Sequence, residues 1–231
     1  MFIVRFLLLS FCFANLSLQA RAESATFHGK TTLKDASYDT LTVNGHFDFD
    51  GLNAQKVTAH GHTAGRNVVA KSMVTHGHTS LIGKKISSLR THGFTDLTDM
   101  NIEKLTTHGS LTVVHSSTSS LDAFGKCELY NTTVSQECSI TSQSITIKDC
   151  TITCNVTIRK SENYNSGWFC SLPVIKWFCT SSDTDQTQIL KIQGTTKITG
   201  NILFESGKGK VYLPTTATVT GKIIGAEVIR S

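Results

Sequence analysis

Eight of the nine histidines stand directly beside a glycine, and imidazole is the side chain here with the widest choice of chemistry. Imidazole nitrogens bind Zn²⁺, Cu²⁺ or Ni²⁺ at about 2.0 to 2.1 Å. An unperturbed imidazole also titrates at about pH 6.5. Metal binding or a response to pH is therefore open to these residues, provided that the fold brings them together. They are His28, His46, His60, His62, His76, His78, His92 and His108.

A repeat of sixteen residues supplies that proximity. Seven glycines, from Gly29 to Gly125, follow one another at this interval. The positions four before, four after and nine after each glycine are mostly apolar, which gives three short segments of period two in each unit. The position six after each glycine favours residues that tolerate a left-handed backbone and so marks a turn. Its occupants are Asp35, Gly51, Asn67, Gly83, Asp99, His115 and Asn131.

This pattern predicts an all-β fold, a single-stranded parallel β-solenoid of about 16 residues per coil. Each coil of a solenoid buries its inward face against its neighbours. Right-handed winding is favoured, since parallel crossovers are nearly always right-handed. We expect one domain over 23–231. It comprises regular coils over 23–158, a loop insertion that contains aromatic residues and cysteines near 159–187, and C-terminal coils over 188–231.

Stacked coils place equivalent residues about 4.8 Å apart, so the histidines fall into two neighbouring columns. Asp48 and Asp96 stand in nearby columns and could assist a metal. Two other interpretations stay open: duplication has copied a purely structural ladder, or the crowded imidazoles sense pH. The candidate ligands for Zn, Cu or Ni are His46, His60, His62, His76, His78, His92 and His108.

Residues 1–22 are predicted to be a secretory signal peptide. Arg5 precedes an apolar stretch, and Ala20-Arg21-Ala22 is an A-x-A cleavage site. A lipoprotein signal ending at Cys12 and an uncleaved anchor are the alternatives. No later segment reaches the about 18 apolar residues of a membrane span. We therefore expect an exported protein, located in the periplasm, on the cell surface or outside the cell.

Six cysteines remain after the leader, and an even number in an exported chain indicates disulfides. The alternative is that several are small buried apolar residues. Cys170 and Cys179 are the best disulfide candidates, since they close a short loop within the insertion. The insertion also concentrates aromatic residues, which either cap the solenoid or contact a partner, the envelope or a glycan. The candidate partner-binding residues are Trp168, Phe169, Trp177 and Phe178.

The C-terminal coils contain the segments Ile198-Thr199-Gly200-Asn201-Ile202-Leu203-Phe204 and Val219-Thr220-Gly221-Lys222-Ile223-Ile224-Gly225. These segments resemble the coils of bactofilins and related polymer-forming bacterial β-helix proteins. The resemblance implies a bacterial right-handed β-helix and end-to-end assembly. The leader, the cysteines and the aromatic insertion depart from that family, whose members form cytoplasmic filaments.

Several function classes fit the sequence poorly. The net charge is +5 without a clustered basic patch, so we expect no nucleic-acid partner. The chain lacks a G-x-S-x-G elbow and a phosphate-binding glycine loop, and its acidic residues are sparse, so we expect no enzyme. Threonine columns that include Thr63, Thr79 and Thr95 resemble the arrays of ice-binding solenoids, but Phe47 and Leu111 interrupt them, so we do not expect ice binding.

The sequence therefore favours an exported, non-enzymatic β-solenoid with a structural, adhesive or assembly role at the bacterial envelope or surface. Its expected partner is a second copy or an envelope component. An envelope metal-binding protein and a β-helical polysaccharide-active enzyme are the alternatives.

Overall fold

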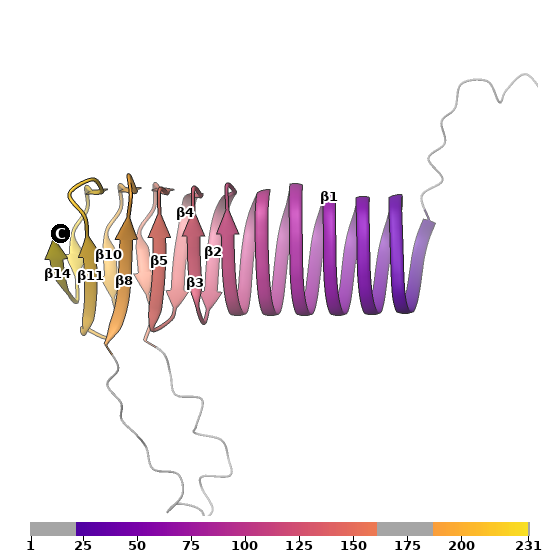
Figure 1. Cartoon of the computed structure of the whole chain (residues 1–231), viewed down its shortest axis with the longest axis horizontal. Helices are drawn as coiled ribbons and strands as arrows, with labels where there is room; N and C mark the ends of the chain where they lie inside the picture. Colours follow the sequence, from indigo (N-terminus) through magenta and orange to yellow (C-terminus); the bar gives the residue numbers. More distant parts are fainter. Residues whose placement is uncertain (1–21, 161–186, 231) are drawn as a thin grey trace, which may run out of the picture.

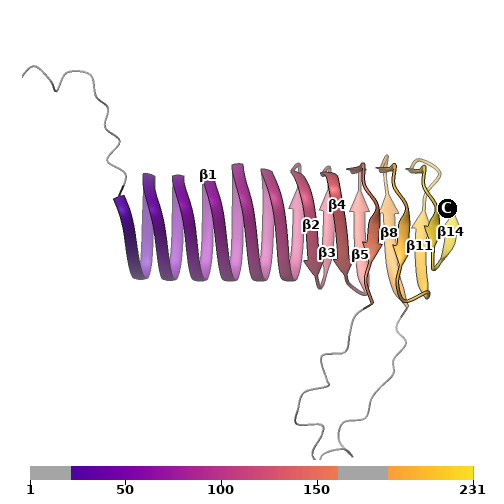
Figure 2. The same ribbon diagram turned by 180° about the vertical axis from the view of Figure 1, so that it is seen from behind.

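The chain folds into a row of stacked β-coils (Figures 1 and 2). A computed structural model describes residues 22–160 and 187–230. Its 14 strands form one sheet in which the pairs are parallel, and this confirms the predicted β-solenoid. Within the described ranges, no helix has the length and apolar character needed to cross a membrane. The favoured right-handed winding stays a prediction.

The first strand winds continuously through the first half of the stack, and shorter strands separated by corners follow. The strands are β1 (Ala22–Val114), β2 (Ser117–Phe124), β3 (Cys127–Tyr130), β4 (Thr133–Thr141), β5 (Ser144–Lys148), β6 (Thr151–Ile152), β7 (Val156–Ile158), β8 (Gln188–Gln193), β9 (Lys197–Ile198), β10 (Ile202–Phe204), β11 (Gly209–Leu213), β12 (Thr218–Val219), β13 (Ile223–Ile224) and β14 (Ala226–Arg230).

The coil length is sixteen residues in the first part of the stack and increases later. β1 pairs with β2 at the predicted interval, for example Asn101 with Ser117. A register shift between Thr118 and Ser120 in the pairing of β2 with β4 adds a residue. Cys127 then pairs with Ile145, eighteen residues on. The sixteen-residue prediction is therefore confirmed for the glycine repeat, whereas the coils after the bulge are wider.

The insertion interrupts the chain without interrupting the stack. β7 ends at Ile158, and its residues pair directly with β10, so that Ile158 lies beside Phe204. β5 and β8 pair in the same way across the insertion. The predicted partner-binding and disulfide residues in the insertion, Trp168, Phe169, Cys170, Trp177, Phe178 and Cys179, lie outside the described residues.

The apolar columns of the repeat form the core, as the period-two pattern predicts. Leu41, Leu97 and Ile102, one from each column, are at most 1% exposed. The threonine column is also internal, since Thr63, Thr79 and Thr95 are each 1% exposed. This burial is consistent with the sequence-based rejection of ice binding, because hydroxyls that point into the core cannot present an array to water. The same column contains Phe47 and Leu111, which are fully buried.

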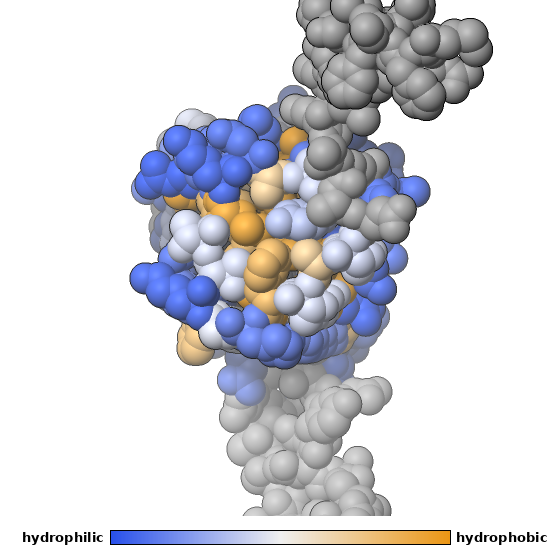
Figure 3. All heavy atoms as spheres, turned by 90° about the vertical axis from the view of Figure 1, so that its right-hand side faces the viewer, coloured by the Kyte–Doolittle hydropathy of each residue, from blue (hydrophilic) through white to orange (hydrophobic). Residues whose placement is uncertain are grey.

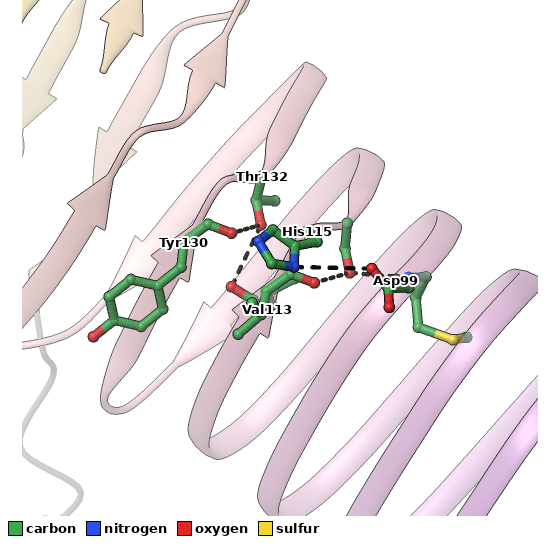
Figure 4. A network of polar contacts seen from close by, with 8 residues as sticks. Asp99, Val113, His115, Tyr130 and Thr132 are labelled. Carbon is green, nitrogen blue, oxygen red and sulfur yellow. Dashed lines mark hydrogen bonds and ion pairs between the residues drawn. The ribbon is translucent and has the colours of Figure 1, made fainter. Parts of the chain in front are cut away.

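The second corner of each coil takes the left-handed backbone predicted for the Asp, Asn and Gly column. The φ angles of Asp35, Asn67 and Asp99 are 46°, 57° and 55°. On the inner side of the later corners, buried hydroxyl groups donate hydrogen bonds to backbone carbonyl oxygens. Thr132 Oγ1 donates to the carbonyl of Tyr130 at 2.9 Å (Figure 4). Outside this corner His115 Nδ1 lies 3.9 Å from Asp99 Oδ1, also drawn in Figure 4. The Thr132 hydrogen bond closes the corner within one coil, whereas the contact of His115 with Asp99 joins successive coils.

The four described cysteines are core residues with free thiols. Burial raises the pKa of the Cys127 thiol to about 12 and that of Cys150 to about 11. Burial also raises the pKa of Cys138 well above its usual value. The expectation that the even number of cysteines reflects disulfides is wrong for these four, which pack as small apolar side chains.

Candidate functional site

Two columns of stacked aromatic rings run along the glycine corner of the solenoid. We call the column before the glycines the long ladder and the column after them the short ladder. In both, neighbouring ring centroids lie 4.6 to 4.9 Å apart and the ring planes are within 12° of parallel. The long ladder consists of His60, His76, His92, His108 and Phe124, and the short ladder of His46, His62 and His78.

The glycines between the ladders are required by the close approach of the coils. Gly77 has a φ of +114°, and a Cβ placed on it would collide with the carbonyl oxygen of Gly61. The same collision recurs at Gly93, Gly109 and Gly125, each against the glycine one coil earlier. Only glycine fits this column, which leaves a strip of bare backbone between the two rows of rings.

Threonine pairs support the corner from the inside. Thr79 Oγ1 donates a hydrogen bond to Thr75 Oγ1 at 2.7 Å, and Thr95 donates to Thr91 at the same distance. The two members of a pair stand two residues before and two residues after the same glycine, so that the hydrogen bond spans the corner. The ladders therefore lie on a corner that a buried hydrogen bond spans in each of these two coils.

The two ladders differ in their electrostatic surroundings. In the short ladder, His46 Nε2 lies 3.0 Å from Asp48 Oδ2, and His78 Nε2 lies 4.0 Å from Asp96 Oδ2. Among the described residues, no carboxylate forms such a contact with the four histidines of the long ladder. The outward column on its far side, three positions before each glycine, contains Thr58, Val74, Arg90 and Thr106. Within the described part of the chain, carboxylates therefore accompany the short ladder and not the long one.

The pKa values of two histidines in the middle of the long ladder are lowered by this environment. Partial burial, followed by the neighbouring imidazoles of His92 and His60, lowers the pKa of His76 from its ordinary value. Partial burial also lowers the pKa of His92, with contributions from His108 and from the guanidinium of Arg90. Both rings are thus held in the neutral form near pH 7.

Parallel stacking disfavours the predicted use of these rings as metal ligands. The nitrogen lone pairs lie in the ring planes, so neighbouring rings direct them side by side, whereas a shared ion must lie about 2.0 to 2.1 Å from each nitrogen. Within 22–160 and 187–230, no group of three or more His, Cys, Asp or Glu side chains is arranged to hold an ion. Metal binding stays a prediction, and it requires the rings to rotate out of the stack.

Two phenylalanines extend the columns of the histidines, and the sixteen-residue interval could have revealed both. Phe124 precedes Gly125 and stacks on His108 with a centroid distance of 4.6 Å, which ends the long ladder. Phe94 follows Gly93 in the column of the short ladder and is 64% exposed. These positions differ from the rest of the columns in residue type and match them only in their place beside the glycine.

No protein-family model matches the chain, and no curated protein or solved structure is significantly similar to it. The ends of the coil stack and the histidine corner are therefore the two features of the molecule from which a function can be proposed.

Proposed function

We propose that the chain is an exported, non-enzymatic β-solenoid with an assembly role at the bacterial envelope or surface, in which copies associate through the ends of the coil stack. The observation that carries this proposal is that the described residues cover the inward apolar side chains of both terminal coils on one side only. The resemblance of the C-terminal coils to bactofilins is consistent with this mode of assembly.

The N-terminal end presents a partly open apolar core. Phe27, Leu33 and Tyr38 pack against the core but are only partly buried. The residues one coil further on, Val43, Phe49 and Ala54, are at most 5% exposed. Figure 3 looks at this end and has hydrophobic residues at its centre and hydrophilic residues around them. An apolar centre with a polar rim is typical of a protein contact surface.

The C-terminal end is open in the same way. Val228 is 37% exposed, although its partner Val211, one coil below, is fully buried. Ile223 is likewise only partly buried above the fully buried Ile202. Of the described strands, β12, β13 and β14 each pair with one strand only. An unpaired strand edge is a template for another chain.

Contact between opposite ends would continue the parallel sheet from one copy into the next. Such a head-to-tail contact does not close on itself, so it produces open filaments rather than dimers. The two apolar end surfaces and the two strand edges would be covered at once, which favours assembly over the isolated chain.

The experiment measures mass as a function of concentration by sedimentation and light scattering. We expect the mature wild-type chain to grow with concentration and the end variants Phe27→Asp and Val228→Asp to remain monomeric. A mixture of the two variants should stop at dimers, because each retains one competent end. Val69→Asp is the matched control, since Val69 is 43% exposed on the side of the stack. A wild-type chain that stays monomeric, or a control as defective as the end variants, overturns the proposal.

A further inference from the structure

The long ladder is a row of four imidazoles without a built-in counterion. His60, His76, His92 and His108 lie one per coil, with ring centroids 4.7 to 4.8 Å apart. Arg90, three positions before Gly93, adds a permanent positive charge to the strip beside them. The row is accessible, since its side chains are exposed or half-buried.

The acidic groups around the ladder are engaged elsewhere. Asp122, the carboxylate in the flanking column, accepts a hydrogen bond from Arg159 Nη1 at 2.9 Å. Glu128 lies 2.8 Å from Lys126 Nζ. The other charged or titratable groups at this corner are His28 and Lys30 on the first coil, and His46, Asp48, His62, His78 and Asp96 across the glycine strip. Of these, Asp48 and Asp96 face His46 and His78 of the short ladder.

Protonation of the long ladder therefore creates a row of like charges that no described side chain is placed to neutralise, so that an external anion can do so. Like charges at this spacing repel one another, which explains why neighbouring rings lower the pKa values of His76 and His92. An anion that lies along the row removes this repulsion and accepts charge-assisted hydrogen bonds from the ring N–H groups. Such an anion binds the protonated form preferentially, and by linkage its affinity rises as the pH falls.

We infer that the long ladder is an acid-dependent binding site for a linear anionic polysaccharide that carries one carboxylate per sugar. In an extended two-fold chain of this kind, consecutive carboxylates point to opposite sides, so those on one side recur at about twice the spacing of one β-coil and meet every second histidine. The bare glycine strip leaves room for the chain beside the ring edges. Phe124 stacks on His108 and ends the row, so that the site spans the four coils that carry the histidines.

The test measures the binding of an oligogalacturonate of at least four units at pH 7.5 and pH 5.5 by calorimetry. Dextran is the uncharged probe, and a single-stranded oligonucleotide is the alternative polyanion. We expect oligogalacturonate to bind at least about tenfold more tightly at pH 5.5, with loss of affinity at high salt and no binding of dextran. In NMR titrations, the ligand should raise the pH midpoints of the ladder histidines. This measurement can also be made nearer neutral pH.

Matched variants separate the two ladders. His76→Gln with His92→Gln should reduce the affinity at pH 5.5 at least about tenfold, whereas His46→Gln with His62→Gln in the short ladder should change it less than about twofold. Circular dichroism verifies that both variants are folded. Equal binding at the two pH values, or equal losses in the two variants, overturns the inference. Tighter binding of the oligonucleotide overturns the assignment to a polysaccharide.

Discussion

At the residue scale, single positions decide whether the glycine corner is hydrogen-bonded. Thr79 and Thr95 have threonine partners across the corner. Thr63 faces Ala59 in the equivalent position, and its buried Oγ1 has no hydrogen-bond partner among the described residues. A buried hydroxyl without a partner costs free energy that the same shape without the hydroxyl does not.

Replacing these hydroxyls by methyl groups should have opposite effects in the two coils. Thr63→Val should leave the free energy of unfolding unchanged or raise it by up to about 1 kcal/mol, since it removes an unpaired polar group. Thr79→Val should lower it by about 1 to 3 kcal/mol, because the buried Thr75 hydroxyl loses its donor. Urea unfolding measures both. Equal effects of the two substitutions would contradict the pairing.

The ladder histidines predict how stability depends on pH. The folded pKa values of His76 and His92 lie below their ordinary value, so the unfolded chain takes up protons first. Stability from these rings is therefore complete above about pH 6.5 and decreases as the pH falls through that value toward the folded pKa values. We expect a lower melting temperature at pH 5 than at pH 7.5. In the His76→Gln, His92→Gln variant this difference should shrink, and an unchanged difference would refute the assignment to these two rings.

At the element scale, the corners matter more than the strands between them. The interval between glycines, the apolar columns and the left-handed Asp and Asn positions could all be predicted, because each depends on one residue type repeated in register. The exact position of the first extra residue, between Thr118 and Ser120, could not be predicted. A single extra residue is absorbed at a bulge, and later residues then no longer fall into the earlier columns. Whether Cys138 forms a disulfide or packs in the core could not be predicted either, because a cysteine is suited to both.

The glycine corner provides a direct test of coil spacing. In Gly77→Ala, the new Cβ meets the Gly61 carbonyl oxygen at a φ of +114°. We expect a loss of at least about 2 kcal/mol in unfolding free energy, from steric overlap added to an unfavourable backbone. Gly29→Ala is the control, because Gly29 also has a positive φ but nothing lies within 4 Å of its Cβ position. It should lose only about 1 to 2 kcal/mol of unfolding free energy, from the left-handed backbone alone, and equal losses would show that contact between coils is not the cause.

At the scale of the whole molecule, the solenoid is a one-dimensional array in which each coil is stabilised by its neighbours. Strand pairing continues across the insertion, as Ile158 beside Phe204 illustrates, so residues between coils can be added without loss of the stack. Coils in the middle have two neighbours and those at the ends have one. The ends are therefore the least stable part of the array and also the surfaces that assembly would cover.

Hydrogen exchange should reveal this gradient and its response to assembly. In dilute solution we expect slow exchange for peptides within 41–158, where core residues such as Leu97 are buried between two coils. Peptides from 22–38 and 218–230 should exchange faster, since their inward residues, Phe27 and Val228 among them, have a neighbour on one side only. Raising the concentration should slow exchange in the terminal peptides alone, because end-to-end contact supplies the missing neighbour. Slowing that is uniform along the chain would instead place the contact on the sides of the solenoid, and the Val228→Asp variant should abolish the effect if the ends mediate it.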